Sequence, residues 1–232
     1  MLRTRVANHG TLNDRSIHLL RLASPSQPVG GFSYSRGLEW AVHSGVVHDE
    51  QTANSWILGL LEHSYAPLDG AFFWRMMHAL RMGSEDCFLE ADAWLGASRE
   101  SREMELEDLR MSEAMLRLLS DLAVPRARNF AERCRTYPAA FAVAAVHWEI
   151  GPSEALRGLM WSVVEAQVSA AIRLIPLGHT SGQRILIASV PVIERAAHQA
   201  EYVSDDDLGN VAPAMAMASA WHETQYSRLF RS

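Results

Sequence analysis

The chain has 232 residues, of which 48% are hydrophobic and 21% are charged, and it carries a formal net charge of -6. This composition predicts one large globular domain or at most two small ones and argues against bulk disorder, while the acidic balance argues against a nucleic-acid-binding protein. All 21 basic residues are arginine, which excludes P-loop NTPases and Schiff-base enzymes because both need a lysine.

Helical periodicity dominates the chain, and prolines and turn residues divide it into segments. The expected helices are 11–23, 35–44, 49–65, 67–82, 84–95, 98–122, 138–149, 152–175, 178–202 and 213–226. Asp49 is expected to cap the third helix. Pro191 is expected to break or kink the segment 178–202, which therefore forms one or two helices. Alternating runs bounded by turn pairs are missing. The sequence therefore predicts an all-α fold, a single-domain bundle of roughly ten helices spanning residues 1–232.

The clearest helix follows Gly151 and ends before Pro176. Its apolar residues recur at steps of three and four, which places them on one face. They are Leu156, Leu159, Met160, Val163, Val164, Val168, Ala171, Ile172 and Ile175. Gln167 falls within this stripe, so its amide must find hydrogen-bond partners in the core.

A run of charged residues opens the helix predicted over 98–122. It contains Arg99, Glu100, Arg102, Glu103, Glu105, Glu107, Asp108 and Arg110. Two carboxylates close together are typical of acid–base catalysis, but spacing within one turn is also typical of a solvated face stabilised by ion pairs. We favour the solvated face. The run Asp205–Asp207 is likewise expected to be an exposed loop.

Neither the cysteines nor the histidines form a metal-binding pattern. Cys87 and Cys134 are far apart in the chain, and we expect two buried thiols in a reducing cytoplasm. None of the ten histidines lies three or four residues from another, and Glu194 with His198 is the best local pair. We predict no catalytic residue and no metal ligand, although a site assembled across the fold or a dimer axis stays open.

A membrane or secreted protein is not expected. The first twenty residues carry charged side chains and lack the apolar run of a secretory signal. The longest apolar run, 139–148, is too short to span a bilayer.

The segment 24–39 differs from ordinary helical sequence. It contains two prolines and the adjacent Gly30 and Gly31, which predicts a shaped loop that allows unusual backbone conformations or the close approach of another chain. Phe32 and Tyr34 follow directly. They are either exposed anchors of an interface or aromatics that pack inward, and the residues alone leave both alternatives open.

The end of the chain is also unusual, because chain ends are commonly polar and frayed. It combines apolar and aromatic residues with arginines: Tyr226, Arg228, Leu229, Phe230 and Arg231. Aromatic side chains with arginine are the composition of a binding hot spot. The tail is therefore expected either to dock on its own domain or to fold onto a partner.

Four motifs, in order along the chain, resemble those of the UreF family of urease accessory proteins. They are Pro28–Ser35 with Gly37–Glu39, Arg99–Glu103, Pro176–His179 with Gln183, and His222–Phe230. The resemblance runs from about residue 19 to residue 232. Residues 1–13 show no family pattern and are expected to be a flexible extension.

The resemblance implies an all-helical, non-catalytic homodimer that binds UreD (also called UreH). That pair recruits the nickel-carrying GTPase UreG and acts on apo-urease. Nickel would be handled by the assembled complex, through an internal tunnel, and the chain would hold no tight cofactor. A modulating effect on the GTPase is also implied, as activator or as restraint.

Position by position, the resemblance assigns two groups of residues to partner binding. The N-terminal group is Gly30, Gly31, Phe32, Tyr34 and Glu39, and the C-terminal group is Gln225, Tyr226, Arg228, Leu229, Phe230 and Arg231. One of the two terminal arginines could act on a bound nucleotide as an arginine finger. The rival hypotheses are a small all-helical enzyme and a direct nickel chaperone, each with a site assembled from distant His and Glu residues.

Overall fold

The computed structural model describes residues 12–231, and their regular secondary structure is entirely helical. No strand occurs within these residues, which form a single all-α domain, so the predicted fold class is confirmed. The predicted extension, residues 1–13, lies outside the described range except for its last two residues, which already belong to the first helix.

The elements follow one another with short connections. The α-helices are α1 (Leu12–Ala23), α2 (Leu38–His43), α3 (Glu50–Leu60), α4 (Ala71–Met82), α5 (Glu85–Ala97), α6 (Arg102–Asp121), α7 (Ala127–Phe130), α8 (Tyr137–His147), α9 (Pro152–Leu174), α10 (His179–Glu201) and α11 (Pro213–His222). Two short 3-10 turns, η1 (Gly31–Ser33) and η3 (Asp205–Asp207), and a π-helical segment, η2 (Leu61–Gly70), complete the elements within residues 12–231.

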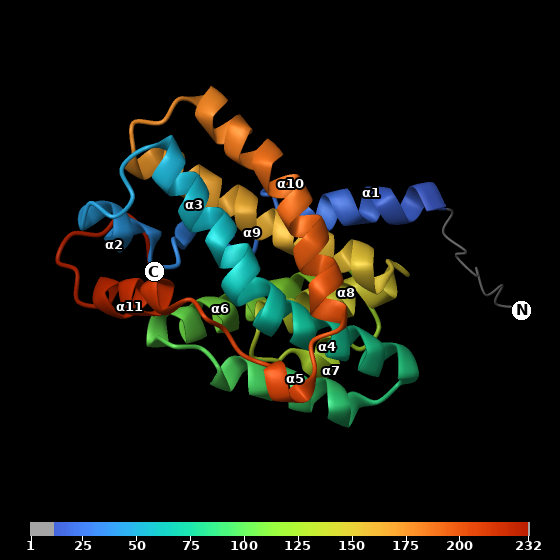
Figure 1. Cartoon of the computed structure of the whole chain (residues 1–232). Helices are drawn as coiled ribbons and strands as arrows, with labels where there is room; N and C mark the ends of the chain where they lie inside the picture. The colour runs from blue at the N-terminus through green and yellow to red at the C-terminus, as the bar shows by residue number, and fades with distance from the viewer. Residues whose placement is uncertain (1–11, 232) are drawn as a thin grey trace, which may run out of the picture.

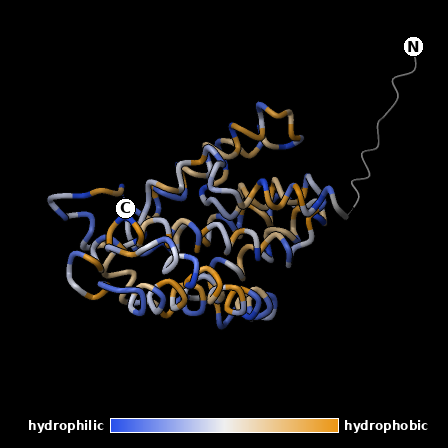
Figure 2. The backbone as a smooth tube through the Cα atoms, turned by 90° about the horizontal axis from the view of Figure 1, so that it is seen from above, coloured by the Kyte–Doolittle hydropathy of each residue, from blue (hydrophilic) through white to orange (hydrophobic). Residues whose placement is uncertain are grey.

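Helix α8 lies at the centre of the bundle, where it packs against α4, α6 and α9. Its alanine-rich sequence is buried from Tyr137 to Ala145, because small side chains let neighbouring helices approach closely from several sides. The apolar stripe predicted for α9 is confirmed, since Leu156, Met160 and Val164 are all buried. Figure 2 shows apolar and hydrophilic residues interleaved along the outer helices, as amphipathic packing requires.

The two ends of the described chain lie apart. In Figure 1, α2, α11 and the C-terminus lie together at one end of the molecule, and the start of α1 lies at the other. No helix within residues 12–231 is long and apolar enough to cross a membrane.

The predicted break before Pro67 is wrong, because α3, η2 and α4 form one continuous helical stretch with Pro67 inside η2. Proline has no N–H, so the carbonyl of His63 loses the bond it would accept in an α-helix. The backbone N–H of Val211 donates to that carbonyl at 2.8 Å instead. The π-helical geometry is thus stabilised by the segment that follows α10.

Helix α10 runs unbroken through Pro191, so of the one or two helices expected over 178–202, one is observed. Two other features differ from the prediction. Helix α11 ends at His222, and the residues up to Tyr226 continue as turns. The short α7 was not predicted, because four residues carry no detectable period.

The prediction that the charged run forms a solvated face is wrong for Arg99, Glu107 and Asp108, whose side chains are buried. The side chain of Arg99 is 3% exposed and pairs with Asp69 at 2.7 Å and with Asp108 at 2.6 Å. Beside it, Arg36 pairs with Glu107 at 2.6 Å. These carboxylates raise the pKa of both arginines against the opposing effect of burial. Local spacing could not reveal this network, because the partners lie on different elements.

The prediction of two buried thiols is half right. Cys134 is buried, and burial raises the pKa of its thiol. Cys87 is exposed on α5, so a reagent in solution reaches one thiol and not the other.

Candidate functional site at the tail junction

Three of the four sequence motifs meet at the end of the molecule where α2 and α11 lie (Figure 1). Helix α2, the start of α6 and helix α11 are joined there by hydrogen bonds between polar side chains. We call this region the tail junction. Its members are Glu39, Ser101, Glu103, Ser219, His222 and the tail residues 223–231.

Glu39, on the first turn of α2, is the anchor for the end of the chain. Its carboxylate accepts hydrogen bonds from the backbone N–H groups of Leu229 at 2.6 Å and Phe230 at 2.9 Å. The ring of His222 contacts the same carboxylate through Nε2 at 3.0 Å. Glu39 is only 6% exposed, so its burial depends on these partners.

Glu103 binds the same tail from the other side. Its carboxylate lies 2.7 Å from Nδ1 of His222 and accepts a hydrogen bond from the guanidinium of Arg228 at 2.6 Å. His222 is completely buried, and one of its ring nitrogens contacts Glu39 while the other contacts Glu103. The imidazole therefore links the two carboxylates that bind the tail.

The C-terminal residues also cap the start of α6. The first N–H groups of a helix have no partner within it and favour negative charge. Ser101 accepts a hydrogen bond from the Met104 N–H, and Glu223 accepts one from the Arg102 N–H at 2.9 Å. The hydroxyls of Ser101 and Ser219 lie 2.6 Å apart, which ties α11 to the same cap.

Two glycines shape the loop that receives the tail. Gly30 and Gly37 both adopt a φ of 79°, in the left-handed region that favours glycine. At Gly37 a Cβ atom would also lie 2.9 Å from the backbone nitrogen of Ser219, so α2 and α11 could not pack this closely with another residue. The carbonyl of Ser33 then accepts a hydrogen bond from the Arg231 N–H at 2.8 Å.

The last aromatic residue docks on the protein's own surface. Phe230 is 4% exposed, and the guanidinium of Arg173 on α9 lies 4.7 Å from the centre of its ring. Of the two outcomes predicted for the tail, docking on its own domain is the one observed.

The predicted site residues divide into a buried and an exposed group. Tyr34, Glu39 and Phe230 are buried, whereas Phe32 and Leu229 are more than half exposed and Tyr226 is fully exposed. Of the two alternatives for these aromatic residues, Tyr34 packs inward and Phe32 is exposed. Glu39 does not face solvent and holds the tail in place.

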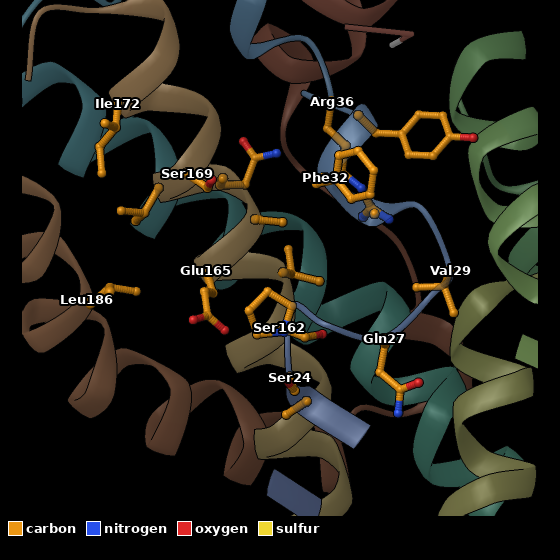
Figure 3. A pocket seen from close by; sticks show the side chains of 18 of the residues that line it. Ser24, Gln27, Val29, Phe32, Arg36, Ser162, Glu165, Ser169, Ile172 and Leu186 are labelled. Atoms are coloured by element: carbon orange, nitrogen blue, oxygen red, sulfur yellow. The ribbon is translucent and has the colours of Figure 1, made fainter. Parts of the chain in front are cut away.

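A pocket of about 460 Å³ lies beside the tail junction and is lined by the loop before α2 and by α9 and α10. Figure 3 shows Phe32 on the loop side and Glu165 and Leu186 on the helix side. Burial raises the pKa of Glu165. His179 and Gln183 line the same pocket, so the third motif also lies near the loop.

Gln167 meets in part the requirement for hydrogen-bond partners that the sequence places on its amide. Its amide donates to the carbonyl of Ser35 at 3.0 Å, which ties the loop to α9. The amide oxygen has no hydrogen-bond partner within residues 12–231.

The UreF family model matches residues 47–190. The chain belongs to the UreF family. The protein named urease accessory protein UreF 2 of Brucella anthropi is 66% identical over 217 residues, which cover 93% of this chain and 96% of that protein. Urease accessory protein UreF of Dechloromonas aromatica is 41% identical, covering 92% of this chain and 96% of that protein. The protein of that name from Alkalilimnicola ehrlichii is 39% identical, covering 92% and 94%.

Within the described part of this UreF-family chain, no group of three or more His, Cys, Asp or Glu residues is placed to hold a metal ion. Glu194 and His198, the best local pair of candidate metal ligands in the sequence, have separate partners. Glu194 pairs with Arg157 at 2.8 Å, while the ring of His198 packs against Tyr202.

Sequence reasoning missed part of the junction of this UreF-family chain. Ser101, Glu103 and His222 lie within the recognised motifs, but nothing local marked them as one cluster. Ser101 was detectable as a serine preceding a helix, a typical N-cap. Arg173 and Ser219 carried no signal, since their partners are distant in the sequence.

Proposed function

We propose that this chain acts in urease maturation as a non-catalytic adaptor. In this proposal it bridges UreD (UreH) and the GTPase UreG during nickel insertion into apo-urease, and it modulates the GTPase. It works as a homodimer in the cytoplasm. Nickel is handled by the assembled complex, and the chain holds no tightly bound cofactor.

The tail junction carries the proposal. A chain end of nine residues is fixed by buried carboxylates on two different helices, through His222 and Arg228 and through backbone N–H groups. Fixing a tail in advance lowers the entropy lost when a partner binds it. The junction therefore presents a preorganised surface.

The outer side of the junction has the composition of an interface. Trp40 and Trp221 pack with ring centres 4.4 Å apart, and Trp221 is 44% exposed. Tyr226, Leu229 and Phe32 are exposed at the same end of the molecule. Exposed aromatic residues next to arginine are enriched at protein interfaces.

On the inner side of the junction, the contacts of His222 favour a structural role over acid–base catalysis. A general acid or base must reach a substrate with a free polar atom. Both nitrogens of His222 are taken by Glu39 and Glu103, and His222 is fully buried.

The test is assembly of the purified chain with UreD and UreG, followed by size-exclusion chromatography with light scattering and by GTPase assays. Tyr226→Ala and Leu229→Ala change exposed side chains and leave Phe230 docked. We expect each to weaken UreG recruitment about tenfold or more, the range of an interface hot spot. Ile187→Ala, at an exposed position on α10, is the matched control. Full assembly and full urease activation by a chain that carries both Tyr226→Ala and Leu229→Ala would contradict the proposal.

Arg228→Ala tests the arginine-finger hypothesis separately. Loss of GTP hydrolysis with UreG still bound would support a finger, whereas loss of binding together with hydrolysis would support the positioning role that its contact with Glu103 indicates.

A further inference from the structure

A second surface lies away from the tail junction, in a groove of about 950 Å³. Helices α4 and α5 form two of its walls, and the segment 205–210 after α10 forms the third. Figure 1 shows this segment passing close to α5. We call the surface between these three walls the α4–α5 groove. Its volume is at the upper end of the range for ligand sites, about 300–1,000 Å³.

The third wall is fixed by several contacts. The N–H of Val211 donates to the carbonyl of His63, and Asp205 pairs with Arg75 of α4 at 2.7 Å. The amide of Asn210 donates to the carboxylate of Glu100. The groove is thus held open by hydrogen bonds at both ends of the segment.

Apolar side chains line the groove from its floor to its rim. Leu68 and Phe72 are buried at the floor. Met82 is 72% exposed and Trp94 is 63% exposed, and both also line the groove. Large exposed apolar residues around a concave surface mark a site of protein interaction.

The charge on the groove is acidic. Its carboxylates are Glu90, Glu100 and Asp205, and Arg75 is its one guanidinium. Arg75 is already paired with Asp205, so the charges of Glu90 and Glu100 are not compensated by an ion pair within residues 12–231. Interfaces match charge of one sign with the other, so the occupant should be basic.

We propose that the α4–α5 groove docks a basic amphipathic segment of a partner protein. Apolar side chains of that segment insert between Met82 and Trp94, and its arginines or lysines lie over Glu90 and Glu100. This is the helix-in-groove mode of recognition, with flanking charge setting the orientation. The inference rests on the proposed function for its partners, UreD and UreG, and places a contact outside the tail junction.

Cys87 provides a direct probe, because it lines the groove and is exposed while Cys134 is buried. The rate of alkylation of Cys87 is measured in the free chain and in the purified complex. We expect the rate to fall about tenfold or more in the complex.

Two variants test the chemistry of the occupant by their affinity for the partner complex. Trp94→Ala should weaken binding about tenfold. Glu90→Arg should weaken it by a similar factor at low salt and by less at high salt, because added salt screens charge repulsion. Asp121→Arg, which reverses an exposed charge at the end of α6, is the control. It should change neither the affinity for the partner complex nor the salt dependence of that affinity.

The outcomes separate this inference from the proposed function. If UreD and UreG assemble with the chain while Cys87 reacts at its free rate and both variants bind normally, the groove proposal is overturned and the adaptor role stands. If Glu90→Arg binds more tightly, the occupant is acidic and the proposal is also wrong. Failure of any assembly to form would overturn both.

Discussion

The α8–α9 core and the polar centre of the tail junction, Glu39 and His222, are both buried, but different forces hold them together. Around α8 the contacts are between alanine, aromatic and aliphatic side chains, whose burial is favourable without direction. At the tail junction and the adjoining Arg36–Arg99 network, buried carboxylates, arginines and a histidine must meet their partners in fixed geometry. The core should therefore tolerate a change of shape at constant volume, whereas the polar region should not tolerate the loss of a partner.

The largest effect is expected when Arg99 is replaced by Met. Asp69 and Asp108 would then remain buried beside an apolar side chain, and breaking a buried pair from one side costs about 3–5 kcal/mol. Urea denaturation measures the free energy of unfolding. The control, Arg102→Met, changes an exposed side chain and should stay within about 0.5 kcal/mol. Equal effects of the two variants would contradict the requirement of the buried polar network for its partners.

Glu39→Gln is expected to have the next largest effect, confined to the tail. Gln keeps one acceptor where Glu39 now accepts from two tail N–H groups, and an unsatisfied buried group costs about 1–3 kcal/mol. Limited proteolysis after Arg228 should accelerate, with little change in the midpoint of global unfolding. Glu105→Gln, at an exposed position on α6, is the control. An unchanged cleavage rate would show that Glu39 does not anchor the tail.

Met115→Leu sharpens the other side of the comparison. Met115 is completely buried in the apolar core, and a swap that conserves volume costs less than about 1.5 kcal/mol. Met115→Ala at the same position should cost about 2–5 kcal/mol, because it leaves a cavity. If Met115→Leu lowered the free energy of unfolding as much as Met115→Ala, the core would tolerate a change of shape no better than the polar junction tolerates the loss of a partner.

The smallest effect concerns Glu165 in the pocket beside the junction. Burial raises its pKa, so the folded protein binds this proton more tightly than the unfolded chain, and stability falls as pH rises through the folded pKa. Glu165→Gln should match the parent below the unfolded pKa and be more stable at neutral pH. Thermal unfolding of both proteins from pH 4 to pH 7.5 measures the difference. A larger gain at pH 4 than at neutral pH would contradict the assignment.

The same contrast explains what the sequence predicted. The α9 stripe was predicted because apolar periodicity is a local signal, and Gln167 stood out as a polar residue within it. Asp49 caps α3 as predicted. The charged run was misassigned because its burial depends on Asp69 and Arg36, which lie about thirty or more residues away along the chain. Local spacing cannot distinguish a solvated charge from one that a distant element neutralises.

The candidate site shows the same limit. Composition and resemblance single out the loop with Gly30 and the tail with Phe230. The hydrogen bond that joins them, from the Arg231 N–H to the Ser33 carbonyl, follows only from the fold. The exposure of Phe32 and the burial of Tyr34 were left open, since two neighbouring aromatics carry no signal for which one packs inward.

The most direct test of the tail junction is amide hydrogen exchange at Leu229 and Phe230 in the isolated chain. Both N–H groups donate to Glu39, so we predict protection well above that of an unstructured chain end, and its loss in Glu39→Gln. Exchange at the rate of an unstructured peptide in the parent protein would contradict the account.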